Sequence, residues 1–233
     1  MPIIVTNEPA KHISPQPGDK YTVDMLRAHQ VYKNAAGKRV PGVTTILGIL
    51  DKPGLLKWAW RMGQEGRDPD KVRDEAAAIG TIAHARVEAF LRGLVFDESG
   101  IAPERLAQSG NAFSAFKEWW GRERYQLVAS ELQLVSERWQ VGGTLDILAC
   151  SPLTLVDIKT SNGLYREHRL QVAAYAAIYE ETHPGERIER LMLVRIPKEE
   201  AGVIEPVEIV NRAECEAAFG SLALTYRLLA KVK

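Results

Sequence analysis

The spacing of apolar residues follows a helical period in the first half of the chain and a strand period in much of the second half. Before either pattern begins, four prolines among residues 1–20 predict an extended N-terminal arm with little regular structure. The stretch HQVYKNAAGKRVPGVTTIL then predicts a short hairpin with its turn near 34–37, leading into a helix capped at Thr44 or Thr45. A second short helix is expected for GLLKWAWRMG, which follows Pro53.

Two longer helices are expected next. Residues 68–93 can begin at a capping Asp68 or Asp70 and end at Gly93. The apolar stripe of this helix consists of Ile79, Ala83, Val87, Phe90 and Leu91. Residues 103–124 form a further helix, with Phe113, Phe116 and Trp120 on one side.

From residue 126 onward the apolar residues alternate as they do in strands. The expected strands lie within 126–150, 155–161, 188–197 and 202–210, and helices are expected over 165–182 and 212–232. Helices followed by strands and then helices predict an α/β fold with a central mixed β-sheet flanked by helices and an N-terminal helical region. No linker interrupts the pattern, so we expect a single domain over residues 1–233.

Composition narrows the class of protein. No run approaches the about 18 apolar residues that cross a bilayer, and the N-terminus lacks a signal-peptide pattern, so a cytoplasmic protein without membrane contact is expected. Cys150 and Cys215 are too few for a disulfide framework or a four-cysteine cluster. Thirty basic and thirty acidic residues give zero net charge, which argues against a protein that only grips duplex DNA non-specifically.

Two carboxylates flank a predicted turn with the sequence SPLT. Asp157 and Lys159 lie two apart in the apolar strand LVDIKTS, so they share a face. If Ser151 and Pro152 form a two-residue turn, Asp146 lies opposite Asp157. If all four residues form the loop, Asp146 lies opposite Lys159, and Pro152 favours this longer loop. Either register puts the two acids and the lysine on one face, because the side-chain period is two.

Such an arrangement needs a counter-charge. Like charges on neighbouring strands destabilise a sheet by about 0.2–1 kcal/mol. Lys159 can neutralise one carboxylate, whereas a divalent cation can neutralise both. Hard oxygen ligands suit Mg²⁺ or Mn²⁺, which share them with phosphate substrates. A polar sheet rim held by Lys159 alone is the alternative interpretation.

Three more polar side chains lie on helices near these strands. His84 is on the edge of the stripe in helix 68–93, and Gly80 removes side-chain bulk one turn before it, as a helix that approaches another backbone or a ligand requires. Gln171 and Tyr175 share a helix face at i and i+4. A hydrogen-bonded structural histidine and an ordinary surface hydrogen bond are the competing interpretations of these residues.

In chain order, GTIAH, GGTLDIL, VDIKTS and QVAAY resemble the motifs of the PD-(D/E)XK nuclease superfamily, and within it the RecB-like and phage-type exonuclease branch. VPGVTTIL also resembles an N-terminal element of phage-borne members. The resemblance covers roughly residues 40–180 and implies a restriction-endonuclease-like core. Leu145 replaces the proline that names the superfamily, and the cysteines of an iron–sulfur cluster are missing, so no such cluster is expected.

The resemblance implies a metal site. Asp146 and Asp157 match metal ligands, and the main-chain carbonyl oxygen of Ile158 is a further one. His84 matches the histidine that joins the metal in RecB-like members. Glu131 resembles an acid that some members use near the metal. The implied cofactor is Mg²⁺ or Mn²⁺.

The resemblance also implies a catalytic group around that metal. It comprises Asp146 and Asp157 together with Lys159, which orients or activates the attacking water and steadies charge on the phosphate. Gln171 and Tyr175 match a downstream pair that supports the lysine or contacts DNA.

The implied activity is metal-dependent hydrolysis of DNA by an exonuclease of phage or recombination and repair type, in the cytoplasm of a bacterial or phage-infected cell. Single- or double-stranded DNA is the expected partner, together with a recombination or single-strand-binding protein. The alternatives are a catalytically inactive nucleic-acid-binding module of the same fold and a hydrolase of another phosphodiester. Candidate DNA contacts are Trp58, Trp60, Trp119 and Trp120 for base stacking, and Lys57, Arg61, Arg166 and Arg169 for phosphates.

Overall fold

A computed structural model describes residue 16, residues 18–27 and residues 31–232. The predicted N-terminal arm therefore lies mostly outside the described residues. Just after it, β1 (Lys20–Tyr21) pairs in parallel with β2 (Val95–Phe96). The short helix α1 (Val23–Arg27) contributes apolar side chains to a small core with α4.

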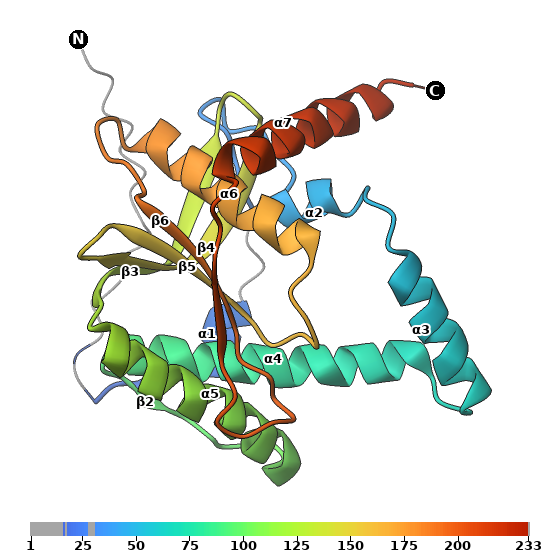
Figure 1. The fold of residues 1–233 in the computed structure, drawn as a ribbon, viewed down its shortest axis with the longest axis vertical. Coiled ribbons are helices and arrows are strands. Elements are labelled where there is room, and N and C mark those ends of the chain that lie inside the picture. Colours follow the sequence, from blue (N-terminus) through green and yellow to red (C-terminus); the bar gives the residue numbers. More distant parts are fainter. Residues whose placement is uncertain (1–15, 17, 28–30, 233) are drawn as a thin grey trace.

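A five-stranded mixed sheet forms the centre of the molecule (Figure 1). Its strands, in spatial order, are β3 (Gln126–Ser136), β4 (Val141–Cys150), β5 (Thr154–Lys159), β6 (Arg190–Arg195) and β7 (Glu205–Glu208). β5 and β6 are parallel and are connected through a helix, whereas the other neighbouring pairs are antiparallel. Because β5 is the third of the five strands in this order, its polar end lies in the middle of the sheet.

Two long helices cover one face of the sheet (Figure 1). In α4 (Pro69–Leu91), Asp68 caps the first turn by accepting the amide hydrogens of Asp70 and Lys71, and Gly93 follows the last turn with a positive φ of 68°. The helix α5 (Pro103–Glu123) packs beside it. Val87 and Phe116 meet Ile147, Val156 and Ile158 of the sheet in one buried core.

The other face of the sheet is covered by three helices. These are α2 (Val43–Leu47), α6 (Arg166–Thr182) and α7 (Arg212–Leu229). Leu145, Leu148 and Leu155 from the sheet pack with Ile178 of α6 and Phe219 of α7 in the larger core. The sheet is therefore enclosed between two helical layers, which buries both its faces.

The N-terminal part of the chain contains the predicted hairpin and two further helices. The hairpin turn forms at 34–37 as expected, with the Gly37 amide donating to the Asn34 carbonyl. The N-cap of α2 is Gly42, not Thr44 or Thr45. The helix already begins at Val43, so both threonines lie inside its first turn. The helix α3 (Pro53–Gln64) lies at an edge of the molecule beside the first turns of α4 (Figure 1).

The predicted α/β class, with a mixed sheet, flanking helices and an N-terminal helical region, is confirmed. The register preferred for the SPLT turn is wrong. β4 and β5 pair Ile147 with Val156 and Ala149 with Thr154, which is the register that puts position 146 opposite position 157. Ser151 adopts a φ of 75°, and this left-handed conformation suits a tight turn.

Within the described part of the chain, no helix combines the length and apolar character needed to cross a bilayer. The two cysteines are separate free thiols, with Cys215 buried and Cys150 half-buried.

Candidate active site

The candidate site forms where β4 and β5 stop pairing. Their ladder ends at Ile147 and Val156, and the next position on β4 is Asp146. The Asp146 carboxylate takes over the role of a main-chain acceptor, because its Oδ2 accepts the amide hydrogen of Ile158 at 2.8 Å. The side chain thus lies in the gap between the diverging strands rather than flat on one face of the sheet.

Strand alternation also breaks at this point. Leu145 and Leu148 both pack into the larger core although they are three residues apart, so the regular period of two does not hold between them. On the neighbouring strand the ladder passes over Glu131, which has a φ of 50°. A positive φ is uncommon for a residue with a side chain. The coupled irregularity of β3 and β4 brings Glu131 and Asp146 together.

Helix α4 supplies an imidazole to the same place. His84 Nδ1 lies 3.8 Å from Asp146 Oδ2. His84, Glu131 and Asp146 can each offer one ligand atom such that these atoms lie within 4.8 Å of one another. Gly80 permits the approach, because a Cβ on it would lie 2.6 Å from Thr160 Oγ1, just beyond β5. This agrees with the expectation that Gly80 removes bulk where the helix approaches another segment.

Asp157 and Lys159 form the other half of the site. Asp157 is 0% exposed, and Lys159 Nζ lies 2.6 Å from its Oδ2. Asp157 Oδ2 is therefore in contact with the Lys159 ammonium group, whereas Asp157 Oδ1 has no hydrogen-bond donor among the described residues. Buried oxygens without donors are rare in folded proteins because they carry a desolvation cost. Asp157 is not part of the three-residue group formed by His84, Glu131 and Asp146.

Burial and mutual repulsion perturb the acids of the site. Burial, reinforced by Asp146, raises the pKa of Glu131 to about 9. Burial raises the pKa of Asp157 to about 6, with Lys159 opposing the shift, and it raises the pKa of Asp146 as well. Burial, followed by the charge of Lys159, lowers the pKa of His84 to about 4. Carboxyl groups gathered in this way favour a cation among them.

The side chain of Lys159 is held in its charged ammonium form. Burial lowers the pKa of Lys159, but the nearby carboxylates of Asp157 and Asp146 raise it more, so the net shift is upward. The Lys159 side chain as a whole is 16% exposed. It can present a positive charge to a phosphate that enters the site.

Gln171 and Tyr175 are joined to each other and close to the strands. Gln171 Nε2 donates to Tyr175 Oη at 2.9 Å. Tyr175 is buried, and its ring packs on Gly143 of the GGTLDIL motif, where a Cβ would overlap the ring. Gly142 makes the same room for the ring of Tyr32. The two glycines of this motif thus admit aromatic rings against β4, a purpose that sequence reasoning did not identify.

Glu88 is a buried acid that sequence reasoning did not include in the site. It lies one turn after His84 on α4, its Oε1 accepts a hydrogen bond from Ser130 Oγ at 2.9 Å, and it is paired with Arg92 at 3.3 Å. Burial raises the pKa of Glu88, and Asp146 adds a smaller upward contribution. The i, i+4 spacing from His84 was the available signal, because such residues share a helix face.

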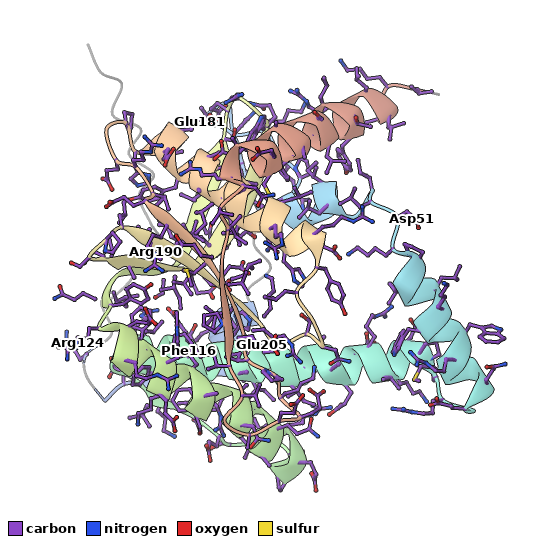
Figure 2. The ribbon with its side chains drawn as sticks, viewed as in Figure 1. Asp51, Phe116, Arg124, Glu181, Arg190 and Glu205 are labelled. Carbon is purple, nitrogen blue, oxygen red and sulfur yellow. The ribbon has the colours of Figure 1, made fainter. Side chains whose placement is uncertain are left out.

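The predicted base-stacking residues differ in their surroundings. Trp119 and Trp120 are buried, 2% and 9% exposed, in an aromatic cluster with Phe116 and Tyr125. They pack between α5 and the sheet and cannot stack on nucleic acid. Figure 2 shows Phe116 in this layer, between α5 and the sheet. Trp60 is exposed, by contrast, and the side chain of Trp58 is half-buried.

The residues present fit a divalent cation. The buried Oδ1 of Asp157, which has no donor among the described residues, is the observation that supports this fit. The nearby set of two carboxylates and one imidazole offers hard oxygen and nitrogen ligands. Ile158 contributes its amide to Asp146, and ligation through its carbonyl oxygen stays a prediction.

No family model matches the chain, and no curated protein matches it. Among solved structures, the protein SSO0001 is 14% identical, with a TM-score of 0.41 over 88% of this chain and 82% of that one. A protein from Eubacterium rectale described as a "putative exonuclease" is 12% identical, with a TM-score of 0.48 over 68% of this chain and 69% of that one.

Proposed function

We propose that this protein is a metal-dependent deoxyribonuclease of the PD-(D/E)XK superfamily, of the RecB-like and phage-type exonuclease branch. The observation that carries the proposal is the buried Asp157 carboxylate, whose Oδ1 has no hydrogen-bond donor and whose Oδ2 contacts Lys159, beside the group of His84, Glu131 and Asp146. Structural ion pairs rarely leave a buried acceptor unsatisfied in this way, whereas a bound metal ion would satisfy it.

The ligands of the proposed Mg²⁺ or Mn²⁺ are Asp146, Asp157 and His84, with Glu131 and the Ile158 carbonyl as further candidates. When bound, the ion would polarise the phosphodiester and lower the pKa of a water nucleophile. The Ile158 amide holds Asp146 Oδ2 in the gap between the strands, so this carboxylate is already oriented before any substrate arrives.

The other side chains have separate tasks. Lys159, positively charged and partly exposed, orients the attacking water and offsets charge that develops on the phosphoryl oxygens. Gln171 fixes the hydroxyl of Tyr175, and this pair supports the wall of the site next to β4. We further propose an exonuclease of recombination or repair type that works in the cytoplasm of a bacterial or phage-infected cell, alongside a recombination or single-strand-binding protein.

The test is incubation of the protein with end-labelled single- and double-stranded DNA, with Mg²⁺, with Mn²⁺ and with chelator. Hydrolysis only in the presence of metal is expected. The variants Asp157→Asn and Lys159→Met should lose at least about 100-fold in kcat, the range observed when a group that stabilises transition-state charge is removed. Asp51→Asn, an exposed acid outside the site, is the matched control and should retain full activity.

Circular dichroism spectra that match the wild type would show that the variants fold. Near-wild-type cleavage by either variant would refute the site assignment. DNA binding without hydrolysis under every metal condition would indicate the inactive binding module instead. Hydrolysis of small phosphodiesters but not of DNA would indicate another substrate.

A further inference from the structure

Helix α3 exposes apolar side chains to solvent. Leu56 is 75% exposed and Trp60 is 67% exposed, and they lie at i and i+4, so they share one stripe of the helix. Met62 points inward and is 6% exposed, so α3 is anchored by its other side. Most of the Trp60 side chain is thus left uncovered by the described residues.

A basic stripe runs directly beside the apolar one. Lys57 and Arg61 each follow a member of the apolar stripe by one residue and are themselves four apart. Among the residues that the structure describes, no carboxylate lies within ion-pair distance of either cation. The helix PGLLKWAWRMGQ contains no acidic residue. The exposed face of α3 therefore combines an aromatic surface with positive charge that nothing described neutralises.

The segment before α3 contacts the first turn of α6. Lys52, which precedes α3, lies with its Nζ 3.5 Å from Glu167 Oε1 in the first turn of α6. The segment 160–165 connects that first turn to Lys159 at the end of β5. Figure 2 shows Asp51 in the segment leading into α3, on the outside of the molecule. The start of α3 is thus tied to the element that directly follows the catalytic strand.

We propose that α3 is a binding element for single-stranded DNA, and this inference rests on the proposed nuclease function. Unpaired bases would stack on Trp60 and Leu56, while Lys57 and Arg61 contact the adjacent phosphates. A positively charged track beside an aromatic stacking surface is the combination that single-strand-binding proteins use. In a duplex the base faces are covered by stacking, so α3 favours single strands or single-stranded ends. An acidic partner of this kind complements the charge of the helix, which a neutral apolar partner would not.

The test compares the affinity for a fluorescein-labelled oligothymidylate with that for a blunt duplex of the same length, by anisotropy in chelator so that nothing is cleaved. Trp60→Ala should weaken oligothymidylate binding by about 5-fold or more and change duplex binding little. The double variant Lys57→Ala, Arg61→Ala should make the negative slope of log K against log salt shallower by about 1.4, since each phosphate contact on a single strand contributes about −0.7.

Matched controls are Val210→Ala, an apolar residue that is 89% exposed, and Arg122→Ala, an exposed cation on α5. Both should bind like the wild type. With Mg²⁺ or Mn²⁺, Trp60→Ala should raise the KM for single-stranded DNA and leave kcat unchanged, because Trp60 touches no reacting group.

The possible outcomes separate this inference from the proposed function. If the wild type hydrolyses DNA and Trp60→Ala binds single strands equally well, the role of α3 is refuted and the nuclease proposal stands. If binding depends on Trp60 but no metal condition yields hydrolysis, the nuclease proposal fails and α3 remains a single-strand-binding element. If the wild type does not bind oligothymidylate, the inference on α3 fails.

Discussion

Substitution of Gly143 by alanine tests how closely α6 packs on the candidate site. A Cβ at this position would overlap Cε1 of Tyr175, lie 3.0 Å from its Cδ1 and lie 3.3 Å from Val43 Cγ2. Both partners are buried, so neither can move into solvent. Overpacking of a closed core costs about 1–3 kcal/mol. Displacement of the ring also breaks the bond from Gln171 to Tyr175, which adds about 0.5–1.5 kcal/mol.

The expected loss is therefore about 1.5–4.5 kcal/mol in the free energy of unfolding, measured by urea titration with an unchanged m-value. Gly121→Ala is the matched control. It lies inside α5, a Cβ there meets nothing within 4 Å, and alanine is the better helix former, so this variant should be at least as stable as the wild type.

A double-mutant cycle isolates the contact. In a Tyr175→Ala background the ring is gone, so Gly143→Ala should cost much less than it does in the wild type. Equal costs in the two backgrounds would refute the reasoning, because the loss would then come from the backbone of β4 and not from the ring.

Two further outcomes are expected. Mn²⁺ at a hundredfold excess over its dissociation constant should stabilise the wild type by about 2.7 kcal/mol and so raise its Tm in differential scanning fluorimetry. The variant Asp146→Asn should show no rise in Tm, and a rise equal to that of the wild type would locate the ion elsewhere. Burial, reinforced by the charge of Lys159, lowers the pKa of His168 to about 4 in the folded protein. The unfolded chain, in which the pKa of histidine is about 6.5, therefore binds a proton at this imidazole at a higher pH than the folded protein does. Stability is lost as the pH falls from about 6.5 toward 4. His168→Gln should flatten that part of the stability profile in urea titrations from pH 7.5 to 4.5, and an unchanged profile would contradict this assignment.

Much of the fold could be predicted because the signals are local. Asp68 caps α4 and Gly93 ends it through contacts within one turn of the chain. The switch from a helical to a strand period placed the sheet between two groups of helices. The closeness of Asp157 and Lys159 follows from the strand period alone.

The candidate site was only partly predictable for the opposite reason. Asp146 reaches the site through a break in strand alternation, and Glu131 joins it with a positive φ that no local preference of glutamate indicates. Glu88 shares a helix face with His84, but no local pattern indicates its contact with Ser130 of β3, more than forty residues away.

The sequence by itself determined the elements, the face that each one presents and the residue types that can bind a cation, because these depend on neighbours within a few positions. The tertiary structure alone decided the register of the SPLT turn and the grouping of His84 with Glu131. It also decided that Trp120 is buried while Trp60 is exposed. The physical reason is that periodicity identifies the apolar face of a helix, whereas burial depends on which other element covers that face.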